Sequence, residues 1–218
     1  MESMVGNVLA SLVSLEERWR LGGLKIIFCI PGSSISGNFF KCWSELAKEL
    51  SSMEIDWELL TEYYPYVHIV RDKIVKKALK KDYDYLMWLD NDIDFTVDDF
   101  KNLLSHAKEC DIVSGVYLAQ KTYGIYDVPS DFACVDMDNN RLNRFDFQGL
   151  PELVQVKANG MGFMLVKKGV FESIDNPFDM GMRKGEDIVF QTKALEKGFK
   201  SYVDPSIFVG HEKTFIMR

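Results

Sequence analysis

YLMWLDNDID, residues 85–94, begins with five consecutive apolar side chains, a pattern typical of a strand buried on both faces of a sheet. The run leads directly into Asp90, Asp92 and Asp94, and side chains that alternate in an extended segment can face the same way. Clustered carboxylates repel one another unless a cation joins them, and a hard divalent cation binds such oxygens while keeping positions for phosphate. The stretch therefore predicts a buried strand that ends at a metal site. The alternative is a solvated acidic turn that caps the next helix.

The chain on both sides of this stretch alternates between strand and helix patterns. Apolar, β-branched runs predict further strands at residues 24–30, 55–60 and 112–117. Apolar residues at helical spacing predict helices at 38–50, 71–80 and 96–107. This alternation is typical of an α/β fold whose mixed, mostly parallel sheet is flanked by helices on both faces.

The second half of the chain is less regular. Its patterns predict a small antiparallel hairpin region at 132–136 and 142–147, a strand at 163–166 and a helix at 186–197. Neither an internal repeat nor a linker interrupts the sequence. We therefore expect residues 24–218 to form a single domain.

Two loops follow predicted strands and carry small or polar residues. Pro31-Gly32-Ser33 follows the strand at 24–30, and Asp90-Asn91-Asp92 follows the strand at 85–89. In open α/β sheets, ligands bind beyond the carboxyl ends of the strands. We expect the two loops to meet there.

Two segments near the end of the chain carry groups that could do chemistry. Glu186 and Asp187 follow Gly185 at a predicted helix start, where a carboxylate could accept a proton from a hydroxyl substrate or simply suit the helix dipole. His211 follows Gly210 and a strand-like run, and a neutral imidazole there could ligate a metal. A single histidine is more often not a ligand, so the residue alone decides nothing.

Two further segments have both a binding and a structural interpretation. Arg71 opens a predicted helix, and its guanidinium could reach a phosphate or a base, or form a surface salt bridge. Gly160 and Gly162 precede a predicted strand, where glycine permits close backbone approach to a ligand or simply makes a turn. Of the other histidines, we expect His68 to be structural and His106 to lie on an exposed helix face.

The composition excludes several classes of protein. The net charge of −7 comes without a basic stripe, which disfavours a nucleic-acid-binding protein. No apolar run approaches the length of a membrane span. The four cysteines are scattered, which favours core thiols in a reducing compartment, and we expect a cytoplasmic protein.

Residues 1–23 predict an amphipathic helix that precedes the domain. Apolar residues recur at helical spacing, and Gly22-Gly23 ends the pattern. Core packing and self-association through residues 1–20 are the two interpretations, and docking to a membrane surface is disfavoured by the mixed charges on the polar face.

Taken in order, these segments resemble the GT-A family of nucleotide-sugar glycosyltransferases, with its DxD-type metal motif. The resemblance covers most of residues 24–211, and the small size is similar to compact viral and bacterial members. Its segments are the first strand with its Pro-containing loop, Arg71-Asp72, residues 83–92, residues 111–117, Asn159-Gly160-Met161-Gly162, residues 185–190 and Gly210-His211.

The resemblance implies a Rossmann-like GT-A catalytic domain that uses Mn²⁺ or Mg²⁺ and a nucleotide-diphosphate sugar, such as a UDP-sugar. Asp92 and His211 would ligate the metal, with Asp90 assisting or binding the ribose. Asp187, with Glu186 beside it, would activate the acceptor hydroxyl of a glycan or glycoconjugate. The nucleotide sugar would also contact a set of loop residues: Pro31, Gly32, Ser33, Arg71, Asn91, Gly160 and Gly162.

The sequence departs from the family pattern in two places, and other functions stay open. Residues 1–23 have no counterpart in the pattern, and Asp72 stands where Asn is frequent, which puts the nucleotide contacts of that loop in question. A magnesium-dependent nucleotidyltransferase is disfavoured because residues 31–40 contain no Lys or Arg. A non-catalytic nucleotide-sugar or carbohydrate-binding module, and an interaction protein that uses residues 1–20, remain alternatives.

Overall fold

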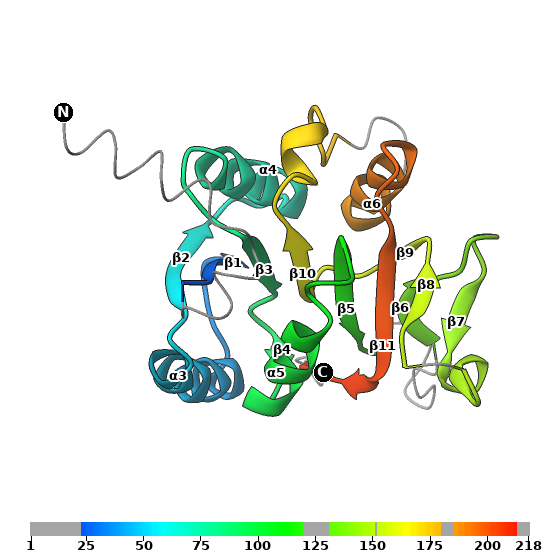
Figure 1. Cartoon of the computed structure of the whole chain (residues 1–218), viewed down its shortest axis with the longest axis horizontal. Helices are drawn as coiled ribbons and strands as arrows, with labels where there is room; N and C mark the ends of the chain where they lie inside the picture. Colours follow the sequence, from blue (N-terminus) through cyan, green and yellow to red (C-terminus); the bar gives the residue numbers. More distant parts are fainter. Residues whose placement is uncertain (1–22, 120–130, 151, 180–184, 213–218) are drawn as a thin grey trace, which may run out of the picture.

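The central element of the computed structural model is a mixed sheet flanked by helices (Figure 1). The structure describes residues 23–119, 131–150, 152–179 and 185–212, so the helix predicted at 1–23 and its self-association surface lie almost wholly outside the described residues. In the described part the sheet has seven strands in the order β2-β1-β3-β10-β5-β11-β8. These are β1 (Lys25–Pro31), β2 (Asp56–Glu62), β3 (Tyr85–Leu89), β5 (Ile112–Val116), β8 (Val154–Val156), β10 (Phe163–Lys167) and β11 (Ser201–Phe208).

The directions of the strands correct one expectation. β1 runs parallel to both β2 and β3, and β11 runs parallel to β5. However, β10 lies antiparallel between β3 and β5, and β8 is antiparallel to β11, so the described sheet is mixed rather than mostly parallel. β10 begins beside the end of β3, with Phe163 opposite Leu89, so it runs back along β3 in the opposite direction. The Asp90 N–H donates to the Gly162 carbonyl at 3.0 Å and fixes the start of β10.

Helices cover both faces of the sheet, as predicted. Alternate residues of β1 divide between two apolar cores, with Phe28 in one and Ile27 in the other. The Phe28 core includes Phe39 and Phe100 from α3 and α5, and the Ile27 core includes residues of α4 and α6. The helices are α3 (Gly37–Ser52), α4 (Val67–Ala78), α5 (Val97–Ser105) and α6 (Glu186–Glu196). Figure 1 shows α4 and α6 on one side of the sheet and α3 and α5 on the other.

Helix starts follow local capping chemistry in one case and not in another. The Thr96 side chain accepts from the Asp99 N–H and the Asp99 side chain from the Thr96 N–H, which forms the capping box that starts α5. α4 begins at Val67 after Tyr66, whose side chain makes no capping bond. The sequence predicts that Arg71 opens this helix, but the helix begins four residues earlier and Arg71 lies inside it.

The second half forms the predicted antiparallel region and some smaller elements. β6 (Asp131–Val135) pairs with β7 (Arg141–Asn143) and with β9 (Ala158–Asn159). The second half of the predicted hairpin is shorter than expected, since residues 144–147 form the 3₁₀ helix η1 (Arg144–Phe147) after the Asn143 cap. Another 3₁₀ helix, η2 (Phe171–Ser173), follows β10. β4 (Ile93–Asp94) pairs with β12 (Gly210–His211).

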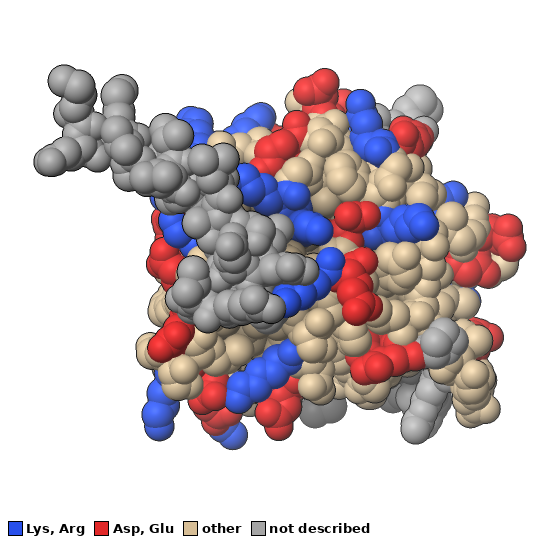
Figure 2. Space-filling view, in the orientation of Figure 1, with Lys and Arg blue, Asp and Glu red and all other residues tan. Residues whose placement is uncertain are grey.

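Three further features of the described residues are the distribution of surface charge, the state of the cysteines and the character of the helices. On the face shown in Figure 2, Lys and Arg side chains are interspersed with Asp and Glu. The four cysteines are buried with free thiols, as expected for core residues. Among the described residues, no helix has the length and apolar character that crossing a bilayer requires.

Candidate functional site

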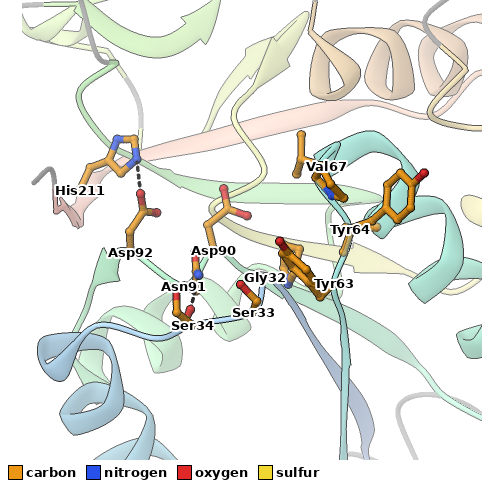
Figure 3. Close-up of a pocket in the computed structure, with 13 residues that line it drawn as sticks. Gly32, Ser33, Ser34, Tyr63, Tyr64, Val67, Asp90, Asn91, Asp92 and His211 are labelled. Atoms are coloured by element: carbon orange, nitrogen blue, oxygen red, sulfur yellow. Dashed lines mark hydrogen bonds and ion pairs between the residues drawn. The ribbon is translucent and has the colours of Figure 1, made fainter.

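A cavity of about 360 Å³ opens at the carboxyl ends of β1 and β3 (Figure 3). Since these strands are parallel neighbours, the loops that follow them meet at one edge of the sheet. The cavity thus joins the two loops that the sequence predicts to converge. Its lining comprises Pro31, Gly32, Ser33, Ser34, Tyr63, Tyr64, Pro65, Val67, Val70, Asp90, Asn91, Asp92 and His211.

Asn91 and Gly32 lock the two loops together. Asn91 donates its side-chain amide to the Ser34 carbonyl, and its own carbonyl accepts from the Ser36 N–H at 3.4 Å. Gly32 has a φ of +131°, and a Cβ built on it would lie 2.6 Å from Asn91 Nδ2. The positive φ therefore favours glycine at position 32, and any larger residue would also have to displace the Asn91 amide. The Asn91 amide serves the loop, so its predicted contact with a nucleotide would have to use other atoms.

Asp90 belongs to a buried charge network, here named the Arg71 cluster (Arg71, Asp90 and Glu186). Arg71 Nη2 donates to both carboxylate oxygens of Asp90, at 2.8 and 3.1 Å, and Nη1 donates to Glu186 at 2.7 Å. The Arg71 side chain is 3% exposed, whereas that of Asp90 is 25% exposed. Burial by itself lowers the pKa of the guanidinium, but the charges of Asp90 and Glu186 outweigh that effect and raise it. Arg71 therefore forms neither a surface salt bridge nor part of the cavity lining.

Asp92 and His211, here named the His211 pair, both line the cavity, and their side chains face one another (Figure 3). Their closest atoms, Asp92 Oδ2 and His211 Nε2, are 3.3 Å apart. The antiparallel pairing of β12 with β4 places His211 opposite Ile93, and the Glu212 N–H donates to the Asp92 carbonyl at 2.7 Å. The last described residues of the chain thus lie beside the end of β3, and this placement brings the imidazole next to Asp92.

The second ring nitrogen of His211 determines what the first can do. His211 Nδ1 lies 3.1 Å from the Leu118 carbonyl, which can only accept, so Nδ1 carries the proton. In the neutral imidazole, Nε2 then carries a lone pair, and this lone pair faces the carboxylate of Asp92. Two acceptors at this distance repel unless a proton or a metal cation lies between them. Histidines that ligate metals usually donate their other ring N–H to a carboxylate, a carbonyl or water, and the contact of Nδ1 with Leu118 is compatible with that arrangement.

Glu186 and Asp187 begin α6 but have different environments. Glu186 belongs to the Arg71 cluster, whereas Asp187 Oδ1 accepts from the Ile188 N–H at 2.8 Å. Burial, followed by the nearby charge of Glu186, raises the pKa of the Asp187 carboxyl above its ordinary value. A carboxylate with a raised pKa is a better proton acceptor, which is the property a general base requires.

Gly160 and Gly162 have a packing role that the sequence does not reveal. A Cβ on Gly160 would lie 2.0 Å from the Tyr117 hydroxyl, and one on Gly162 would lie 3.0 Å from the same group. The Tyr117 hydroxyl accepts from the Gly162 N–H at 3.0 Å, and the Tyr117 ring packs edge-on to that of His211. Neither glycine lines the cavity. Their predicted contact with a donor sugar therefore stays a prediction, and Tyr117 explains why both positions are small.

Sequence reasoning missed the aromatic side of the cavity. Tyr63 and Tyr64 line it, and both rings are exposed. Lys73 Nζ lies 4.9 Å from the centroid of the Tyr64 ring. The run EYYPY at residues 62–66 was the available signal, since exposed aromatic clusters are a common feature of binding sites.

Comparison with known proteins supports the fold. No protein-family model matches the chain, and no curated protein sequence matches it. Among solved structures, the crystal structure of A197 from STIV is similar, with a TM-score of 0.57 and 20% sequence identity. The match covers 89% of this chain and 97% of that chain. At this identity the similarity shows the fold alone.

Proposed function

We propose that this protein is a metal-dependent glycosyltransferase with a GT-A fold, which moves a sugar from a nucleotide-diphosphate donor to a hydroxyl acceptor. The observation that carries the proposal is the His211 pair: an imidazole nitrogen and a carboxylate oxygen, 3.3 Å apart in the lining of a cavity. A cation between these acceptors would remove their repulsion. The pair lies beyond the carboxyl end of β3, which is where α/β sheets bind ligands.

The donor atoms of Asp92 and His211 would bind Mn²⁺ and Mg²⁺ with different affinities. A carboxylate oxygen is a ligand for either ion, but an imidazole nitrogen favours Mn²⁺ over Mg²⁺. Asp92 and His211 would hold the cation, and the diphosphate of the donor would occupy its remaining positions. When bound, the cation would act as a Lewis acid that stabilises the negative charge on the departing diphosphate.

The chain's own residues would bind and orient the donor. The 31–34 loop, where Gly32 permits close backbone approach, would lie along the nucleotide. The exposed rings of Tyr63 and Tyr64 offer apolar faces on which a base can stack. Asp90 keeps part of its side chain exposed, so its oxygens can also accept from ribose hydroxyls while Arg71 holds the carboxylate in place.

Asp187 is proposed to take the proton from the acceptor hydroxyl. Its raised pKa increases its basicity, and it belongs to the same charged surroundings as Arg71 and Asp90. Glu186 would contribute indirectly, because its ion pair with Arg71 fixes the first turn of α6.

A binding experiment tests the metal assignment. Thermal shift and calorimetry would be run with UDP and other nucleoside diphosphates, each with and without Mn²⁺. A ligand at 100 times its Kd adds about 2.7 kcal/mol of stability, so a diphosphate should raise the Tm clearly, and only with Mn²⁺ present. Asp92→Asn and His211→Gln should remove this metal-dependent shift, whereas the exposed Asp98→Asn on α5 should retain it.

A turnover experiment then separates an enzyme from a binding module. Donor hydrolysis or transfer would be followed with the nucleotide sugar whose nucleotide binds best. Asp187→Asn should keep metal-dependent donor binding and lose turnover. Metal-dependent binding with no turnover on any acceptor would favour the carbohydrate-binding alternative, and equal diphosphate binding by wild type and Asp92→Asn would overturn the metal assignment.

A further inference from the structure

A second group of potential ligands lies outside the cavity, where three segments of the chain meet. His106 follows the last turn of α5, Asp204 lies in β11, and Glu152 lies just before β8. α5 packs against β11, and β8 pairs with β11, which brings these segments together (Figure 1). His106, expected on an exposed helix face, is in fact 9% exposed.

The three side chains lie close enough together to become ligands of one metal ion after a small movement. His106 Nε2 is 2.9 Å from Asp204 Oδ2 and 3.9 Å from Glu152 Oε1, and one ligand atom of each residue lies within 4.8 Å of the others. Ligands of tetrahedral Zn²⁺ with bonds of 2.0–2.1 Å are roughly 3.3 Å apart. The observed separations bracket that value. The Glu152 side chain is 74% exposed and can close the remaining gap at little cost.

Asp204 is held so that one of its oxygens faces His106. Its Oδ1 accepts from the Ser206 N–H at 2.8 Å and from the Ser206 hydroxyl at 2.6 Å. Its Oδ2 lies 2.9 Å from Nε2 of the His106 imidazole. The register of β11 against β5 shifts between Val203 and Phe208, and such irregularities turn a side chain out of the ladder. Asp204 is 1% exposed, so its orientation is set by the interior and not by solvent.

We propose that His106, Asp204 and Glu152 form a zinc site, with a water molecule as the fourth ligand. One imidazole and two carboxylates are a set that Zn²⁺ accepts, and the outer hydrogen bonds to Asp204 are of the kind that orient metal ligands. The ion would replace the direct contact between His106 Nε2 and Asp204 Oδ2. It would tie the end of α5 to β11 and to the segment before β8. The proposal does not depend on the glycosyltransferase assignment.

The experiment measures Zn²⁺ binding by calorimetry in the full chain carrying Asp92→Asn and His211→Gln, which removes the His211 pair as a competing site. One Zn²⁺ should bind, and it should raise the Tm. Adding Glu152→Gln, an exposed change that leaves the fold intact, should weaken binding about tenfold or more. The exposed Glu109→Gln should leave the affinity unchanged.

Two further measurements complete the test. Adding His106→Gln should abolish binding, whereas His68→Gln on α4 should not. X-ray absorption at the zinc edge should show nitrogen and oxygen neighbours without sulfur, which excludes the cysteines. If Zn²⁺ fails to bind, or binds equally well after Glu152→Gln, the proposal is overturned, and His106 and Asp204 are a hydrogen-bonded pair only. If His106→Gln does not fold, the Glu152→Gln comparison still decides.

Discussion

The Arg71 cluster and the His211 pair lie at the same end of the sheet, and each contains one aspartate from the motif that follows β3. Asp90 receives two hydrogen bonds from a guanidinium that is 3% exposed. Asp92 lines the cavity with 35% of its side chain exposed, and an imidazole nitrogen lies 3.3 Å from its carboxylate. The comparison teaches that two carboxylates of one acidic motif can have different surroundings: a buried guanidinium balances Asp90, whereas Asp92 lies beside an imidazole in the cavity lining, where we propose that it holds a cation.

The largest expected effect comes from removing the cation of the Arg71 cluster. Arg71→Ala leaves Asp90 and Glu186 without their shared partner, and breaking a buried pair in this way costs about 3–5 kcal/mol of unfolding free energy. Urea denaturation measures the loss. Lys76→Ala, on the exposed side of the same helix and paired with Asp72, should cost about 0.5 kcal/mol or less. Equal losses in the two variants would show that the cluster contributes no more than a surface pair.

A smaller loss is expected when only Asp90 is changed. Asp90→Asn removes one of the two carboxylates while Arg71 keeps its bond to Glu186. A hydrogen bond to a charged group contributes about 1.5–3 kcal/mol, and denaturation should show a loss of that size. A change no larger than that of Asp92→Asn would remove the distinction between the two aspartates.

The pH dependence of turnover sharpens the comparison on the side of the Arg71 cluster. Because burial and Glu186 raise the pKa of Asp187, the carboxyl stays protonated to a higher pH than an ordinary aspartate. As the proposed base, it is active only when ionised, so kcat/KM should fall about tenfold, or 1.4 kcal/mol, per pH unit below that raised pKa. A pH–rate profile measures it, and an acid limb at the ordinary Asp pKa would exclude Asp187.

The raised pKa of Asp187 also affects how the free energy of unfolding depends on pH. Between the unfolded and folded pKa values of Asp187, the folded state binds more protons, so the stability falls as the pH rises through that interval. Asp187→Asn removes this carboxyl and should flatten that part of the stability profile. Glu196→Gln, at the last turn of the same helix, serves as the control.

The smallest effect on stability is expected for Asp92. Without metal, Asp92→Asn should change the unfolding free energy by no more than about 0.5 kcal/mol, since the side chain is partly exposed and the new amide can donate to His211 Nε2. The same variant should lose metal-dependent diphosphate binding. A loss of several kcal/mol in denaturation would mean that Asp92 serves the fold rather than a ligand.

Local patterns in the sequence were sufficient for much of the architecture. The five apolar residues before Asp90 form β3 within the predicted bounds, because a short apolar run that ends at polar residues is typical of a strand buried on both faces. Thr96 and Asp99 cap α5, because capping depends on residues three positions apart. The meeting of the 31–33 loop with Asp90-Asn91-Asp92 also followed from strand order alone.

What the sequence could not supply were pairings between distant positions. Arg71 and Glu186 are 115 positions apart, and His211 and Leu118 are 93 apart, so no local rule links them. Likewise, a Cβ at Gly160 would clash with Tyr117, and the buried His106 contacts Asp204, which is 98 positions away. For the same reason, the sequence did not predict that β10 lies between β3 and β5 and runs antiparallel to both.

The sequence by itself thus determined the α/β class, the ends of the main strands and the clustering of acids at one sheet edge. These features depend on burial periodicity and capping, which act over a few residues. Only the tertiary structure decided that Asp90 is neutralised from within and that Asp92 faces His211. A charge's role depends on its distance from other charges and from water, and the folded chain alone sets both.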